Sequence, residues 1–106
     1  MSRFTLVLAL AGSLSAGIAL AADITVRQKG STFDQEKVTV RVGEEIVFLN
    51  DDRVAHNVMS ASGGNKFNLG LQKPGDSQAI AFEKAGRVDV RCAIHPKMKM
   101  VIEVTE

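Results

Sequence analysis

The sequence has no tryptophan, no tyrosine, two histidines and a single cysteine in 106 residues. A lone cysteine excludes an internal disulfide, so Cys92 needs another explanation. Neither sign of charge dominates, because 13 basic residues meet 12 acidic ones, and no run of lysine or arginine is present. The chain therefore lacks the features of a nucleic-acid-binding protein. The length predicts one small domain.

The first 21 residues have the features of a signal peptide. Arg3 supplies a positive start, residues 4–20 are almost wholly apolar or small, and Ala19-Leu20-Ala21 fits the small-x-small pattern of a cleavage site. A membrane-spanning helix needs about 20 strongly apolar residues, whereas this run is shorter and is diluted by glycine and serine. We therefore expect cleavage after Ala21, a mature domain of residues 22–106 without a membrane anchor, and a periplasmic location.

From Ala22 onward, apolar and polar residues alternate with a period of two, which is typical of half-buried strands. Glycine and Pro-Gly turns separate these segments, and helical periodicity is absent. The pattern predicts an all-β fold, a Greek-key antiparallel β-sandwich of seven to eight strands, with residues 67–71 too short to assign on their own. The expected strands are 24–27, 37–42, 46–49, 55–59, 67–71, 78–82, 87–92 and 100–105.

Three side chains that can bind a soft metal lie within seven residues near the C-terminus, namely Cys92, His95 and Met98. Strand alternation places Cys92 on the inward face, because it continues the parity of Val90. The last strand places Met98 inward by the same argument, because it shares the parity of Ile102. We therefore expect the thiol and the thioether to face each other across one loop.

A fourth ligand must come from elsewhere, and His56 is the only other histidine. It follows a polar loop, residues 50–53, and shares its parity with Val58, so we expect it to point inward at a strand end. Two imidazoles and one thiolate form a trigonal site, which a more distant methionine completes as the blue-copper donor set. Zinc sites rarely recruit a thioether. The four side chains therefore favour one copper ion.

These residues resemble the cupredoxins, the type 1 blue copper proteins, over the whole mature chain. The similarity is to the short-loop branch that includes amicyanin. It implies that His56, Cys92, His95 and Met98 hold the metal and that Asn57 ties the His56 loop to the Cys92 loop. The motifs that carry it are Val40-Arg41-Val42-Gly43, Phe48-Leu49-Asn50-Asp51-Asp52, His56-Asn57-Val58 and Cys92-x2-His95-Pro96-x-Met98.

The choice of the axial methionine has an alternative. The chain also resembles plastocyanin and pseudoazurin, whose pattern has two more residues between the histidine and the methionine. Met100 would satisfy that longer spacing here. Met98 is favoured because Ile102 and Val104 then fall on the inward positions of the closing strand. Met100, however, stands where the short-loop branch commonly has glycine.

The resemblance implies a carrier of single electrons rather than an enzyme, with His95 as the electron port beside Pro96, Ile94 and Leu71. Its partners would be redox proteins, such as an amine dehydrogenase and a c-type cytochrome, and the mature chain is expected to be a monomer. A periplasmic copper carrier or chaperone would use the same residues. An enzyme in which Cys92 is the nucleophile would need an orienting group that the sequence does not supply.

Four cations lie in sequence beside the expected ligands, and Asp51 and Asp52 partly offset them. No acidic residue lies between the cysteine and Met100. We therefore expect this end of the molecule to attract an acidic redox partner. The cations are Arg53, Arg91, Lys97 and Lys99.

Overall fold

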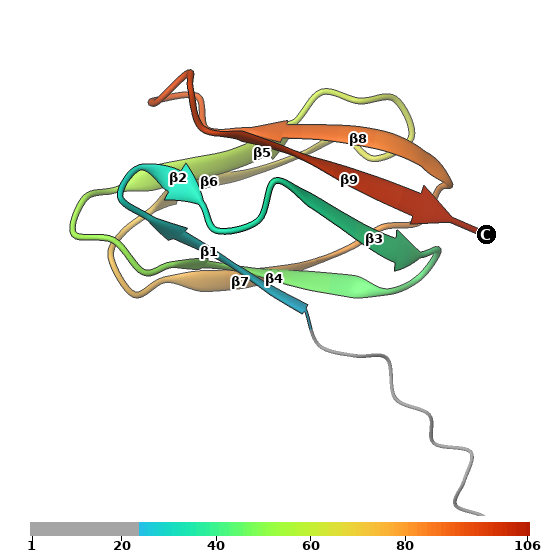
Figure 1. Ribbon diagram of the computed structural model, residues 1–106, viewed down its shortest axis with the longest axis horizontal. Coiled ribbons are helices and arrows are strands. Elements are labelled where there is room, and N and C mark those ends of the chain that lie inside the picture. The colour runs from blue at the N-terminus through green and yellow to red at the C-terminus, as the bar shows by residue number, and fades with distance from the viewer. Residues whose placement is uncertain (1–23) are drawn as a thin grey trace, which may run out of the picture.

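The computed structural model describes residues 24–106, and the expected signal peptide lies outside this range. Figure 1 shows two layers of strands, and none of the described residues belongs to a helix. Consequently, this part of the chain contains no helix that could cross a membrane. The strands are β1 (Ile24–Lys29), β2 (Thr32–Phe33), β3 (Lys37–Arg41), β4 (Glu45–Asn50), β5 (His56–Ser60), β6 (Phe67–Gln72), β7 (Ser77–Ala81), β8 (Gly86–Arg91) and β9 (Lys99–Thr105).

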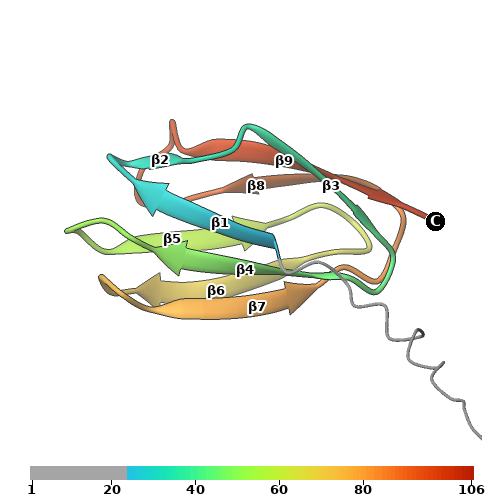
Figure 2. The ribbon, with the colours of Figure 1, turned by 60° about the horizontal axis from the view of Figure 1, so that its bottom comes forward.

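The strands form two sheets that pack face to face, as Figure 2 shows. One sheet has the order β2-β1-β4-β7, and the other has the order β3-β9-β8-β5-β6. The predicted all-β Greek-key sandwich is confirmed. Two pairs are parallel, β1 with β4 and β3 with β9, because the chain changes sheets between the partners. The alternation of apolar and polar residues indicates which face of a strand is buried. It does not indicate whether the neighbouring strand is parallel or antiparallel.

Eight of the strands lie where the sequence predicts them, and β2 is the addition. The chain reverses after β1 because Gly30 and Ser31 adopt φ values of 63° and 55°. β2 then pairs antiparallel with the end of β1. A strand of two residues is too short to produce an alternating pattern, so the sequence gives no signal for it.

The core follows the predicted alternation. In β8, Val88 and Val90 are buried while Arg87 and Asp89 are exposed, and Cys92 continues the inward set just beyond the strand. In and before β9, the inward face consists of four more apolar side chains. Burial stabilises each such side chain by roughly 1.5–3 kcal/mol relative to exposure. The four residues are Met98, Met100, Ile102 and Val104.

Strand pairing brings distant segments to one end of the sandwich. β5 runs antiparallel to both β6 and β8, so the beginning of β5 lies near the ends of those two strands. β8 also runs antiparallel to β9, so the end of β8 lies beside the beginning of β9. His56 opens β5, and Cys92 follows β8 directly. The fold therefore brings these two residues together from 36 positions apart in the sequence.

Candidate metal centre

Three potential ligands converge at this end of the sandwich. The Nδ1 atoms of His56 and His95 lie 3.1 Å apart, and Cys92 Sγ lies 3.7 Å from His95 Nδ1. All three donor atoms lie within 4.8 Å of one another. His56 and Cys92 are fully buried, whereas His95 is half-buried in the loop after β8. The predicted His-Cys-His group is therefore assembled.

The loop from Cys92 to Met98 is closed by its own main chain. The Cys92 N–H donates to the Met98 carbonyl at 3.1 Å, and the Met98 N–H donates to the His95 carbonyl at 2.9 Å. Met98 is 1% exposed. Met100 is also buried, but it pairs with Val90 inside the β8–β9 ladder. Met98 is thus the methionine whose backbone is bonded directly to Cys92 and His95.

Asp52 fixes the orientation of the His56 ring. Its Oδ2 lies 2.8 Å from His56 Nε2 and 2.9 Å from the Ser31 N–H, and its Oδ1 accepts from the Arg53 N–H at 2.8 Å. The hydrogen bond from His56, followed by those two backbone N–H groups, holds the pKa of Asp52 well below its usual range. An ionised carboxylate can only accept a hydrogen bond, so His56 Nε2 carries the proton of this bond. The other ring nitrogen, Nδ1, faces the potential metal ligands His95 and Cys92.

Asp52 is a site residue that the sequence analysis missed. Its signal was its position four residues before His56 in an acidic loop. The Ser31 N–H completes the hydrogen bonds of the Asp52 carboxylate. The local sequence does not indicate this contact, because Ser31 is 21 residues away from Asp52. Histidine ligands are commonly held by a carboxylate on the second ring nitrogen, which fixes the tautomer and the ring plane.

Asn57 joins the two loops, as the resemblance implied. Its backbone N–H donates to Cys92 Sγ at 3.3 Å, and its side-chain Oδ1 accepts from the Ala93 N–H at 3.1 Å. One residue therefore contacts both the thiol and the main chain that follows it. The hydrogen bond to the sulfur fixes the position of Sγ beside the two histidine rings.

A buried amide network supports the loop that carries Asp52. Asn50 accepts from the Asp52 N–H at 3.0 Å and donates to the carbonyls of Val54 and Gln72, each at 2.9 Å. The side chain of Gln72 accepts from Gln28 at 2.6 Å and donates to the Phe48 carbonyl at 3.2 Å. Asn50, Gln28 and Gln72 are all 0% exposed. The loop is thus anchored to β1, β4 and β6.

The donor set fits copper better than other common metals. Imidazole nitrogen and thiolate sulfur suit copper, and a methionine at the end of the same loop adds a thioether. Calcium and magnesium prefer oxygen ligands, and the one carboxylate here, that of Asp52, is engaged by His56 and two backbone N–H groups. The site is therefore that of a soft or borderline transition metal.

Comparison with known proteins agrees with this chemistry. The chain is 34% identical over 65 residues to the methylamine utilization protein MauL of Methylorubrum extorquens, which covers 60% of this chain and 57% of that protein. It is 31% identical over 72 residues to amicyanin of Paracoccus versutus, covering 63% of this chain and 54% of the relative. The chain thus spans about half the length of the relatives it matches.

A solved structure shares the fold. The copper-containing nitrite reductase of Thermus scotoductus superposes with a TM-score of 0.77 at 25% identity, over 90% of this chain and 25% of that one. The model of the copper-binding proteins of the plastocyanin/azurin family matches residues 20–105, which is most of the chain. Fold, donor set and family model agree, and the chain belongs to the plastocyanin/azurin family of copper-binding proteins.

Proposed function

We propose that this member of the family is a periplasmic electron carrier whose single copper ion is held by His56, Cys92, His95 and Met98. The observation that carries the proposal is the convergence of the first three side chains within 4.8 Å. Copper bound there supplies a one-electron couple between Cu(I) and Cu(II). The signal-peptide pattern of residues 1–21 supports the periplasmic location.

The main-chain geometry supports Met98 as the axial residue. Its backbone is bonded to both Cys92 and His95, so its side chain leaves the same short loop. Met100 lies two residues farther along, opposite Val90 inside the β8–β9 ladder. Thioethers at axial positions bind weakly and at long range, so a side chain held by the loop itself suits the role.

The residues around the site keep it rigid during electron transfer. Asp52 holds the ring of His56, and Asn57 holds the thiol of Cys92. Cu(I) and Cu(II) prefer different coordination, and a fixed intermediate arrangement lessens the movement that each electron step requires. The chain's contribution is therefore to hold its donors at one geometry in both states.

Burial argues for a carrier rather than an enzyme. Cys92 and His95 are close enough to form a nucleophile and its base, with Sγ 3.7 Å from Nδ1. Cys92, however, is 0% exposed, so a substrate atom has no path to the sulfur. An electron needs no such path, because it can leave through the half-buried ring of His95.

Exposed apolar side chains lie in or beside the segments that carry the proposed ligands. Leu71 is 61% exposed, Ile94 is 50% exposed and Val54 is 48% exposed, and each lies beside a ligand-bearing segment. We call these three residues, together with Pro96, the docking patch. Exposed apolar patches of this kind mark protein contacts. The patch supports a redox protein as the partner, and the resemblance to amicyanin extends the proposal to an amine dehydrogenase and a c-type cytochrome. Within this proposal the carrier is a monomer.

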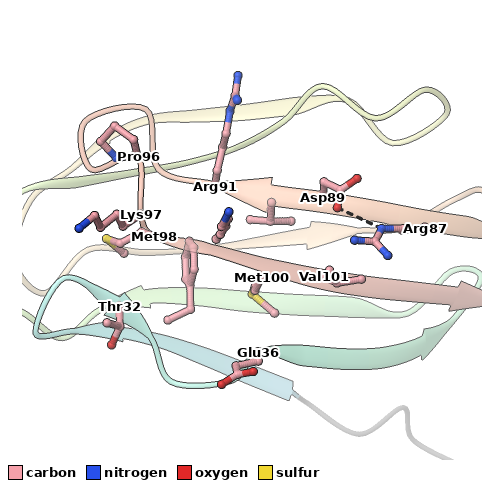
Figure 3. Close-up of a pocket in the computed structure, with 13 residues that line it drawn as sticks. Thr32, Glu36, Arg87, Asp89, Arg91, Pro96, Lys97, Met98, Met100 and Val101 are labelled. Carbon is pink, nitrogen blue, oxygen red and sulfur yellow. Dashed lines mark hydrogen bonds and ion pairs between the residues drawn. The ribbon is translucent and has the colours of Figure 1, made fainter.

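Cations extend from the docking patch along one side of the molecule. Figure 3 shows Lys97 and Met98 on one side of a groove and Thr32 and Glu36 on the other, with the Arg91 side chain extending away from Thr32 and Glu36. Lys99 also lines this groove. Arg91, Lys97 and Lys99 are exposed, and two acids also line the groove, Glu36 and Asp89, of which Asp89 is paired with Arg87 at 3.1 Å. This excess of positive charge supports a partner with an acidic docking face.

Adding Cu(II) to the mature domain, residues 22–106, tests the proposal. We expect one copper per chain and an intense visible charge-transfer band from the thiolate. A carrier keeps its copper through repeated cycles of ascorbate reduction and ferricyanide oxidation in the presence of a Cu(I) chelator. Loss of copper to the chelator within the first cycles would instead assign the chain to copper delivery, and the absence of a band would reject the ligand set.

A further inference from the structure

Asn68, an exposed residue of β6, contacts the residue that holds the thiol. The Nδ2 of Asn57 donates to Asn68 Oδ1 at 2.8 Å and to the Gly70 carbonyl at 3.0 Å. Asn68 Oδ1 also accepts from the Gly70 N–H at 2.8 Å. One carboxamide oxygen thus receives both the side chain of Asn57 and the main chain of β6.

A bulge in β6 places Asn68 where it can make these bonds. Asn57 pairs with Leu71 and Met59 pairs with Asn68, so β6 takes three steps where β5 takes two. The extra residue is accommodated by Gly70, whose φ is 73°. A β-carbon at this glycine would meet nothing within 4 Å, so glycine is needed for its backbone conformation and not for space.

These bonds leave the carboxamide of Asn57 only one orientation. Both hydrogens of Nδ2 point to oxygens of β6, and Oδ1 is therefore turned toward the Ala93 N–H. The backbone N–H of the same residue donates to Cys92 Sγ. A chain of hydrogen bonds therefore runs from the surface of β6 to the sulfur.

We propose that Asn68 is a positioning residue for the Cys92 thiolate and that it acts through Asn57. The proposal rests on the proposed role of Cys92 as a metal ligand. Hydrogen bonds to the cysteine sulfur tune the potential of copper–thiolate sites, because they withdraw charge from the sulfur and so disfavour Cu(II). Asn68 thereby raises the reduction potential of the copper, although it lies on the solvent face of a strand that carries no ligand.

The first test uses the metal-free protein and amide hydrogen exchange by NMR. In Asn68→Ala, we expect the N–H groups of Asn57 and Ala93 to exchange about five- to tenfold faster, as the loss of one net hydrogen bond predicts. The amide of Val90, in the middle of β8, should keep its rate. Asn68→Asp retains an acceptor oxygen at the same place, so its exchange should stay at the wild-type rate.

The second test measures the reduction potential of the copper-loaded protein. Asn68→Ala should have a lower potential than the wild type, whereas Thr39→Ala, a neutral change at an exposed position of β3, which carries no ligand, should leave it unchanged. Unchanged exchange and potential in Asn68→Ala would overturn the proposal, as would uniformly faster exchange that includes Val90, or faster exchange in Asn68→Asp. A protein that fails to bind copper would reject the ligand set but not the exchange result.

Discussion

The two halves of the metal centre are held by different kinds of contact. On the His56 half, the side chains hold the site, because Asp52 binds the ring, and Asn50 binds the Asp52 N–H and the Val54 carbonyl. On the Cys92–Met98 half, the loop is closed by two hydrogen bonds of its own main chain. Asn57 is the connection between the halves.

This difference indicates that the two halves have different rigidity. Burial separates them as well, since His56 is fully buried and His95 is half-buried. Hydrogen bonds in a dry interior are strong when the groups are paired, and the side chains of Asn50 and Asp52, which hold this loop, are paired. The His56 half is therefore organised before metal arrives, whereas the loop half supplies the half-buried ring of His95, the Ile94 and Pro96 side chains of the docking patch, and the soft sulfur donors.

The largest expected effect comes from removing the Cys92 sulfur from the loop half. Cys92→Ser should abolish the visible charge-transfer band, because the band comes from the copper–thiolate bond. Ala93→Ser, which adds a hydroxyl one position along, should keep it. The visible spectrum of copper-loaded protein decides the matter, and a blue Cys92→Ser variant would remove Cys92 from the site.

The next largest effect concerns the buried amides that support the His56 half. Gln72→Met leaves Gln28 without its partner, so we expect a loss of about 1–3 kcal/mol in the free energy of unfolding. Gln28→Met combined with Gln72→Met removes both polar groups and should recover most of this loss. Urea unfolding of the two single variants and the double variant measures the coupling.

The carboxamide oxygen of Gln28 affects the expected change in the free energy of unfolding. Gln28 Oε1 is buried and has no hydrogen-bond partner among the described residues. An unpaired buried acceptor costs about 1–3 kcal/mol, so the wild type already carries part of the penalty. If the two single effects simply added in the double variant, Gln28 and Gln72 would be acting independently, contrary to their 2.6 Å contact.

A smaller effect distinguishes the two methionines. Met98→Gln should keep the copper and lower its reduction potential, because an amide oxygen is a harder ligand than a thioether and favours Cu(II). Met100→Gln should change the potential far less. Cyclic voltammetry of both variants makes the comparison, and a potential that moved with Met100 alone would establish the longer loop spacing.

The sequence predicts the parts of this molecule that are encoded locally. Alternation places Val90 and Cys92 on the inward face because successive side chains point to opposite sides of a strand. The spacing from Cys92 to Met98 likewise belongs to one loop. His56 could be paired with that loop because it was the only other histidine in the chain.

The parts that escaped prediction depend on contacts between distant segments. Gln28 meets Gln72 across 44 positions, and Ser31 meets Asp52 across 21. In an isolated strand, a buried glutamine and an exposed one look alike, so neither the amide network nor β2 has a local signal. Asn68 contacts Asn57 only because a bulge shifts the register of β6. Such shifts are set by the whole sheet.

The smallest expected effect concerns how the loop half meets its partner. Lys97→Glu combined with Lys99→Glu reverses two charges beside His95 and should leave the visible spectrum intact. At low salt, association with an acidic cytochrome should slow, because steering depends on the local field and is screened over about 10 Å at 0.1 M salt. Lys66→Glu with Lys84→Glu makes the same change in net charge at segments that carry no ligand, so it should slow association much less. The measurement is the second-order rate of electron transfer against ionic strength. Wild-type rates in both double variants at every ionic strength would leave the docking patch as the determinant of the encounter, and equal slowing in both would assign the steering to net charge and not to these two lysines.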